Sequence, residues 1–178
     1  MKRTELEHIL RAAGDIADDD EIIVIGSQSI LGQFPDAPAE LCVSVEADVY
    51  PKNFPTRWDL IDGCIGEGSP FHETFGYYAQ GVEEGTATLP KGWKDRLVVV
   101  HNNNTRGITG LCLDAHDLAI SKYVAGRDKD DRFLRAAVRH HLVKRDVLLA
   151  RLNEAELPTP QKGSIADRIA LHFAEEQR

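Results

Sequence analysis

The chain has 178 residues, close to the size of one domain, and can bury a core without disulfides or metals. Its 42% hydrophobic and 28% charged residues exclude a wholly disordered or collagen-like protein. No apolar run approaches the roughly 20 residues that a membrane-spanning helix needs, and the first residues lack the apolar core of a signal peptide. Three scattered cysteines, Cys42, Cys64 and Cys112, argue against a zinc site or a disulfide framework. We therefore expect a cytoplasmic protein with reduced thiols and no membrane contact.

Charge is distributed unevenly along the chain. The whole sequence carries a formal net charge of −8, which argues against indiscriminate binding of nucleic acids. Residues 122–151, however, contain nine Lys and Arg against four Asp and Glu, a local net charge of +5 that leaves −13 for the remainder. Such a basic face could receive phosphates, whereas the simpler interpretation is a set of solvated helix faces.

The first part of the chain alternates between helical and extended patterns. Apolar spacing predicts a helix over 4–17, followed by a short buried strand over 22–25 that ends at Gly26. A short helix is expected over 27–33, and Pro35 and Pro38 indicate a loop over 34–40. Residues 41–49 alternate between apolar and polar side chains, a pattern typical of a strand.

The remaining elements shift from mixed to helical. We predict a helix over 56–65, a strand within the aromatic-rich residues 71–82, and further strands over 87–89, 96–101 and 108–113. Helices are expected over 115–126, 131–141, 145–155 and 164–176. The predicted fold class is α/β (α+β), a short mixed sheet flanked by helices. Residues 1–114 form the core, and residues 115–178 form a helical tail docked on it as part of one structural domain.

The strongest candidate site combines a Gly-Ser turn with an acidic pair. Gly26 and Ser27 follow the buried strand, where backbone N–H groups and a hydroxyl can contact phosphate oxygens. Glu46 and Asp48 lie two apart on the next strand and therefore point to one face, as ligands for Mg²⁺ or Mn²⁺. Alternatively, the two acids line the exposed face of an edge strand.

The segment SPFHETFGYY, residues 69–78, offers a second group of candidates. His72 titrates near neutral pH, Glu73 is its neighbour, and Tyr77 could stack on a nucleobase. The competing interpretation is an aromatic core with a hydrogen-bonded structural histidine.

The quoted residues resemble a known superfamily. The runs IVIGSQSILG and SVEADVYP resemble the signature of the nucleotidyltransferases. The run DLAISKYVAGRDKDDRF is similar to a helix pair in minimal nucleotidyltransferases of toxin–antitoxin and abortive-infection systems, and IDGCIGEGSPFHETFGYYAQGV resembles an uncharacterised bacterial family with the same fold. The resemblance covers about residues 20–135.

The resemblance implies roles for individual residues. Gly26 and Ser27 would contact nucleotide phosphates, and Glu46 and Asp48 would bind the catalytic metal. Lys122 would approach phosphate from the helical part. The neighbours of Lys122 in this role would be Arg127, Lys129 and Asp130.

The sequence departs from the superfamily pattern in three respects. The acid pair is Glu-x-Asp rather than Asp-x-Asp, and 18 residues separate Ser27 from Glu46. A third carboxylate, which acts in the family as the base, does not occur within the strands predicted over 96–101 and 108–113.

Three functions follow from these patterns. The first is metal-dependent transfer of a nucleotidyl group from a nucleoside triphosphate (NTP) to a hydroxyl of tRNA, another RNA or a protein, with residues 122–151 contacting phosphates. The second is a catalytically degenerate fold that binds a nucleotide or a protein. The third, compatible with either, is a toxin–antitoxin component that contacts a cognate antitoxin protein through its acidic surface.

Overall fold

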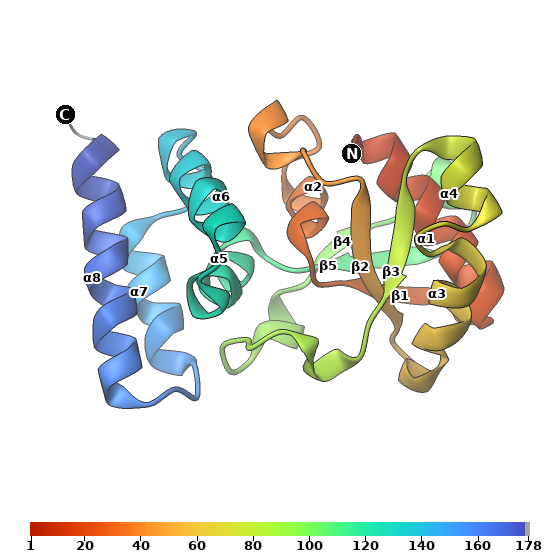
Figure 1. Cartoon of the computed structure of the whole chain (residues 1–178). Coiled ribbons are helices and arrows are strands. Elements are labelled where there is room, and N and C mark those ends of the chain that lie inside the picture. The colour runs from red at the N-terminus through yellow and green to blue at the C-terminus, as the bar shows by residue number, and fades with distance from the viewer. Residues whose placement is uncertain (177–178) are drawn as a thin grey trace. The chain divides into compact units, whose positions relative to one another are not determined.

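The computed structural model describes residues 1–176, which divide into two compact units (Figure 1). The first unit consists of Met1–Thr86 and Leu97–Asp114. The second consists of Ala87–Arg96 and the chain from Ala115 onward. The segment 87–96, predicted as part of the core, thus groups with the C-terminal helices. The docking of the helical tail on the core stays a prediction.

A five-stranded mixed sheet forms the centre of the first unit, in the order β3-β2-β1-β5-β4. Strands β1 and β2 are antiparallel, as are β4 and β5, whereas β1 pairs with β5 and β2 with β3 in parallel. The prediction of a short mixed sheet flanked by helices is confirmed. The strands are β1 (Glu21–Val24), β2 (Glu46–Pro51), β3 (Tyr78–Gly81), β4 (Val98–Val100) and β5 (Thr109–Cys112).

Helices α1, α2 and α3 cover one face of the sheet. They pack so closely on it that glycine is required at several positions of the interface. A Cβ atom at Gly110 of β5 would lie 2.4 Å from Leu10 of α1, and one at Gly32 of α2 would lie 2.4 Å from the Cβ of Cys112 in β5. A Cβ atom at Gly81 of β3 would meet the backbone of α3. Larger side chains at these glycines would hold helix and sheet apart. The helices of this unit are α1 (Arg3–Ala17), α2 (Ile30–Gln33), α3 (Trp58–Ile65) and α4 (Pro70–Phe75).

The strand predicted over 41–49 is shorter than its sequence pattern, and the strand predicted over 87–89 is absent. Strand β2 begins at Glu46 rather than at residue 41, and Val43 and Val45 before it are 77% and 46% exposed. The alternating pattern therefore extends beyond the residues that have a strand partner. Residues 87–89 form no strand. Short 3-10 turns occupy Ser27–Ser29, Ala39–Leu41, Pro55–Arg57, Glu84–Thr86, Trp93–Arg96 and Asn103–Thr105.

The aromatic-rich segment 71–82 contains a helix that the sequence analysis missed. Helix α4 begins after Ser69, whose hydroxyl accepts a hydrogen bond from the backbone N–H of His72. Pro70 occupies the first helical position, which suits its fixed φ angle. Gly76 ends the helix with φ 76°, and β3 follows. The aromatic content favoured a strand, but the Ser-Pro start signal dominates locally.

The second unit consists of four helices tied to segment 87–96 by a buried charge. Asp117 of α5 is fully buried and accepts hydrogen bonds from Arg96 at 2.8 and 2.9 Å. The Nε atom of Arg151 in α7 lies 3.3 Å from the same carboxylate. Two guanidinium groups thus compensate for the desolvation of one buried carboxylate. The helices are α5 (Ala115–Ala125), α6 (Asp128–Arg139), α7 (Arg145–Glu154) and α8 (Thr159–Glu176). None of the helices within residues 1–176 is both long and apolar enough to cross a membrane.

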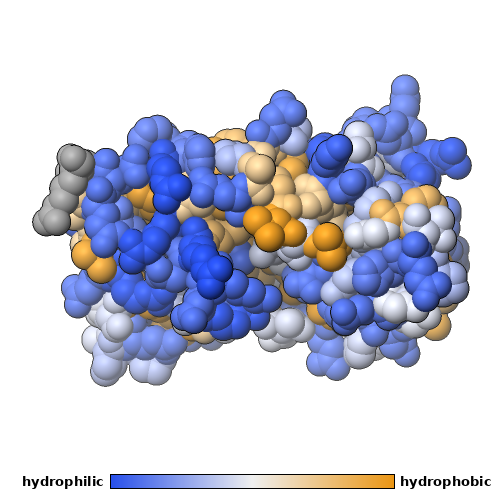
Figure 2. Space-filling model, turned by 45° about the horizontal axis from the view of Figure 1, so that its top comes forward, coloured by the Kyte–Doolittle hydropathy of each residue, from blue (hydrophilic) through white to orange (hydrophobic). Residues whose placement is uncertain are grey.

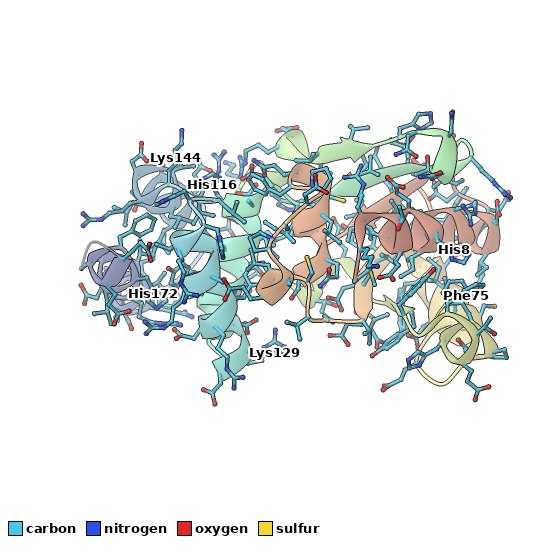
Figure 3. All side chains as sticks on the ribbon, turned by 90° about the horizontal axis from the view of Figure 1, so that it is seen from above. His8, Phe75, His116, Lys129, Lys144 and His172 are labelled. Atoms are coloured by element: carbon cyan, nitrogen blue, oxygen red, sulfur yellow. The ribbon has the colours of Figure 1, made fainter. Side chains whose placement is uncertain are left out.

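His172 links α8 to two other helices of this unit (Figure 3). Its Nδ1 lies 3.0 Å from the Tyr123 hydroxyl, and its Nε2 lies 3.2 Å from Asp131 Oδ1. Burial lowers the pKa of His172 below its ordinary 6.5. The positive charges of Arg135 and Arg168 act in the same direction and, with burial, outweigh Asp131. His172 is therefore neutral in the folded protein at neutral pH.

The lowered pKa predicts that acid weakens the helical unit. Below about pH 6.5 the unfolded chain takes up a proton that folded His172 resists, so the free energy of unfolding falls as the pH falls. We expect His172→Gln to remove this part of the pH dependence. Urea unfolding at about pH 7.5 and about pH 5.5 measures it. With Trp58→Phe in both proteins, fluorescence reports only Trp93 of the second unit. Equal pH dependence in both proteins would contradict the prediction.

Candidate functional site

The end of β1 and the middle of β2 bring the Gly-Ser turn against the acidic pair. Continuing the antiparallel register of β1 and β2, the backbone N–H of Ile25 donates to the carbonyl of Asp48 at 3.0 Å. The next residue, Gly26, lies so close that a Cβ atom there would be 1.6 Å from Asp48 Oδ2. Its φ of −84° is open to any residue, so the contact with Asp48, and not the backbone conformation, requires glycine. Ser27 follows directly and opens a 3-10 turn.

Glu46 and Asp48 share the sheet face opposite α1, α2 and α3. Val49 pairs with Gly81, which packs against α3, so alternation along β2 turns the two acids to the other face. Both side chains are partly exposed. This face is thus accessible to solvent at the two carboxylates, and the Gly26-Ser27 turn borders one of them.

Tyr78 holds one of the two carboxylates. It is the register partner of Glu46 on β3, and its hydroxyl donates a hydrogen bond to Glu46 Oε2 at 3.0 Å. Burial raises the pKa of Tyr78 to about 12, and the hydrogen bond to Glu46 and the charges of Glu67 and Asp48 act in the same direction. The phenol therefore remains a hydrogen-bond donor at neutral pH.

The donor set fits a divalent cation shared with a phosphorylated ligand. Within the described residues 1–176, no group of three or more His, Cys, Asp and Glu is arranged to hold a metal ion, so a cage made wholly of protein ligands is excluded there. Mg²⁺ is commonly bound by one or two carboxylates together with substrate phosphates. Glu46 and Asp48 would supply the two carboxylates, and the Asp48 carboxylate lies against the Gly26 backbone in the space that any side chain at position 26 would occupy.

The candidate residues of the SPFHETFGYY segment lie in different surroundings: His72 lies beside Tyr78, and Tyr77 lies beside α1. The ring of His72 lies 4.6 Å from that of Tyr78, and its Nδ1 accepts a hydrogen bond from Gly68 N–H at 3.1 Å. The Tyr77 hydroxyl instead lies 2.8 Å from Nδ1 of His8 on α1, within a cluster of rings that includes Phe75 (Figure 3). Glu73 is exposed on α4. His72 thus supports the residue that holds Glu46, whereas Tyr77 packs α4 against α1.

Three of the helical-unit candidates form an ion cluster, in which the buried Lys122 and the exposed Arg127 both contact the buried Asp130 carboxylate. Lys122 is 6% exposed, with its Nζ 3.1 Å from Asp130 Oδ1 and 4.4 Å from the centre of the Phe133 ring. Arg127 Nε donates to Asp130 Oδ2 at 2.6 Å. Burial alone would raise the pKa of Asp130, but the Arg127 hydrogen bond and the Lys122 charge together lower it. Lys129 is exposed at the start of α6 (Figure 3).

The two units carry opposite net charges. The first unit has six Lys and Arg against 18 Asp and Glu, a formal charge of −12, and the second has 15 against 11, a charge of +4. Much of the helical unit, on the left in Figure 2, has a hydrophilic surface. Its exposed cations include Lys129, Arg132, Arg139, Lys144 and Arg145.

Sequence reasoning missed the contact between Tyr78 and Glu46. The two residues are 32 positions apart, and only the parallel register of β2 and β3 places them side by side. The alternation of apolar and polar residues predicts which face Glu46 lies on, but a single sequence contains no signal for the register of strands so far apart.

A known protein family matches most of the chain. Residues 4–165 match the family model described as a nucleotidyltransferase of unknown function (DUF6036). The chain belongs to this nucleotidyltransferase family. The match extends into both units, and the predicted relation to the nucleotidyltransferase superfamily is confirmed. No curated protein and no solved structure matches the chain. The relation to toxin–antitoxin systems stays a prediction.

The contact between Gly26 and Asp48 predicts that alanine destabilises the protein at position 26 but not at position 63. Gly26→Ala drives a methyl group into the Asp48 carboxylate, and we expect it to lower the free energy of unfolding by roughly 1–3 kcal/mol. It should also abolish any stabilisation by Mg²⁺ with an NTP. Gly63→Ala is the matched control, because nothing lies within 4 Å of its Cβ position in α3. Thermal melting with and without ligands compares them, and equal behaviour would contradict the site geometry.

Proposed function

We propose that this protein is a metal-dependent nucleotidyltransferase, which moves a nucleotidyl group from an NTP to an acceptor hydroxyl. The observation that supports this most directly is the contact between Gly26 and the Asp48 carboxylate, which brings the Gly-Ser turn beside the acidic pair. Membership of a nucleotidyltransferase family supports the reaction class.

In this proposal each candidate site residue of the first unit has one role. The Gly26-Ser27 turn binds and orients the triphosphate, and Glu46 and Asp48 hold Mg²⁺ or Mn²⁺. When bound there, the cation supplies neutralisation of phosphate charge and alignment of the attacking and leaving oxygens. The acceptor oxygen forms a bond to the α-phosphorus, the bond from that phosphorus to the bridging oxygen breaks, and pyrophosphate leaves. The hydroxyl proton is released to the solvent.

The acceptor in this proposal is a hydroxyl of tRNA, another RNA or a protein. The net charge of +4 on the second unit and the exposed cations of α6 and α7 favour RNA, since each phosphate contact displaces a counterion. Lys122, Arg127 and Lys129 stay our predicted phosphate contacts, with Asp130 as their partner. A cognate antitoxin would instead contact the first unit, whose charge of −12 suits a basic partner.

A second candidate function is a nucleotide- or protein-binding module without turnover. It is favoured by the composition of β4 and β5, Val-Val-Val and Thr-Gly-Leu-Cys, which include no carboxylate to serve as base. The two functions differ in whether a covalent product forms, so a transfer assay separates them.

The transfer assay uses each of the four NTPs labelled at the α-phosphate, with Mg²⁺ and total RNA or a protein extract. We expect the label to appear on RNA, and Asp48→Asn to abolish its transfer. The matched control is Asp15→Asn, which makes the same charge change at an exposed position of α1. Helix α1 precedes β1 and Gly26 follows it, so Asp15 adjoins the other end of this strand from the candidate site. Ligand-induced stabilisation without labelled product would favour the binding module.

Asp48→Asn also distinguishes a ligand-binding site at Asp48 from a polar surface that binds no ligand. Without ligand we expect its Tm to equal that of the parent or to rise slightly, because repulsion with Glu46 is relieved. With an NTP and Mg²⁺ the parent should gain stability in proportion to occupancy, and the variant should not. An equal ligand-induced shift in both proteins would remove Asp48 from the site.

A further inference from the structure

The glutamate of the acidic pair has a more flexible side chain than an aspartate would have. Glu46 has one more methylene than the aspartate usual in the resembled motif, so its carboxylate has more rotamers to lose when it binds a cation. A ligand that moves freely binds weakly, and ligating carboxylates are therefore commonly fixed by hydrogen bonds from neighbouring groups.

Tyr78 supplies such a hydrogen bond. Its hydroxyl donates to Oε2 of Glu46 at 3.0 Å from the neighbouring strand. The ring is 6% exposed, so the hydroxyl is held by a packed side chain rather than by a mobile one. A phenol donates a single proton, and here that proton goes to one oxygen of the Glu46 carboxylate.

The segment before β3 in turn fixes the ring of Tyr78. His72 lies against it, with ring centres 4.6 Å apart and ring planes 48° apart. The imidazole is anchored through its Nδ1 by the N–H of Gly68, and its backbone is anchored by the hydroxyl of Ser69. A chain of contacts thus connects Gly68 and Ser69 through His72 and Tyr78 to the Glu46 carboxylate.

We propose that Tyr78 is a positioning residue for Glu46, and that residues 68–78 act as a support that holds this carboxylate ready for a divalent cation. The inference rests on the proposed role of Glu46 as a metal ligand. It assigns a function to a segment whose sequence resemblance brings no chemistry, and it explains why a glutamate can replace an aspartate in this pair.

A purely structural role for Tyr78 makes a different prediction. If the ring only fills space beside His72, phenylalanine would serve equally well, since it keeps the packing and loses only the hydroxyl. Tyr77 provides a matched control in the adjacent position. Its hydroxyl also makes one side-chain hydrogen bond, to His8 at 2.8 Å, but that bond does not involve Glu46.

The test measures the Kd for Mn²⁺ alone by electron paramagnetic resonance of the free ion. We expect Tyr78→Phe to raise Kd about 10-fold or more, as other losses of hydrogen bonds to metal ligands do. Tyr77→Phe should leave Kd unchanged. In a Glu46→Asp background the shorter side chain no longer reaches the phenol, so Tyr78→Phe should have no further effect on Kd. Thermal melting of each variant without metal verifies that the fold is intact.

The outcomes separate this inference from the proposed function. If Glu46→Gln and Asp48→Asn bind Mn²⁺ as the parent does, both the metal site and the support are wrong. If these two variants lose binding but Tyr78→Phe has the same Kd as Tyr77→Phe, only the support is wrong. His72→Ala is a second variant, which keeps the phenol but removes its packing partner. It should raise Kd less than Tyr78→Phe does, and an unchanged Kd would exclude His72 from the support.

Discussion

The antiparallel pairing of β1 with β2 is the constraint on which the candidate site depends. The central strand β1 is buried from Ile22 to Ile25, so its position is set by the core and not by the site. Its register places Gly26 against Asp48. A slip of one residue would turn Glu46 and Asp48 toward the face covered by helices, where two carboxylates would be desolvated. The packing of the core therefore selects the register that leaves the acidic pair in contact with solvent.

The separation of charge bears on which ligand the first unit can accept. A unit with a net charge of −12 repels a bare triphosphate. The same carboxylates attract a divalent cation, and a triphosphate bound to that cation carries less negative charge. Glu46 and Asp48 would thus decide the form in which a nucleotide binds. Most of the exposed Lys and Arg among the described residues lie instead on the second unit, whose positive charge suits a ligand with many phosphates.

Local patterns predicted more of the fold than of the candidate site. The apolar run of β1 and the helical spacing of α1 and α5 were visible because each depends on neighbouring residues. The sequence pattern does not predict helix α4 because the aromatic residues that pack it against α1 also favour strands, and its start signal is only the short Ser69-Pro70 pair. The Tyr78–Glu46 contact depends on strand register, which is set by the whole core. Gly26 was predicted as a phosphate contact, but its contact with Asp48 is visible only in three dimensions.

The row of side chains that contains Asp48 shows why nucleotide binding and turnover are separate questions for this protein. Asp48 is followed across the sheet by Ile25 next to β1 and, on continuing the β1–β5 register by one residue, by Leu113. The next row on this face contains Tyr50, Ile23, Leu111 and Val99. Neither row adds a carboxylate to Asp48. In the proposed function, Glu46 and Asp48 would hold the cation beside the Gly26-Ser27 turn, whereas neither row contains a second carboxylate that would accept the proton of the acceptor hydroxyl. A nucleotide-induced rise in Tm therefore establishes binding, and only the covalent product establishes transfer.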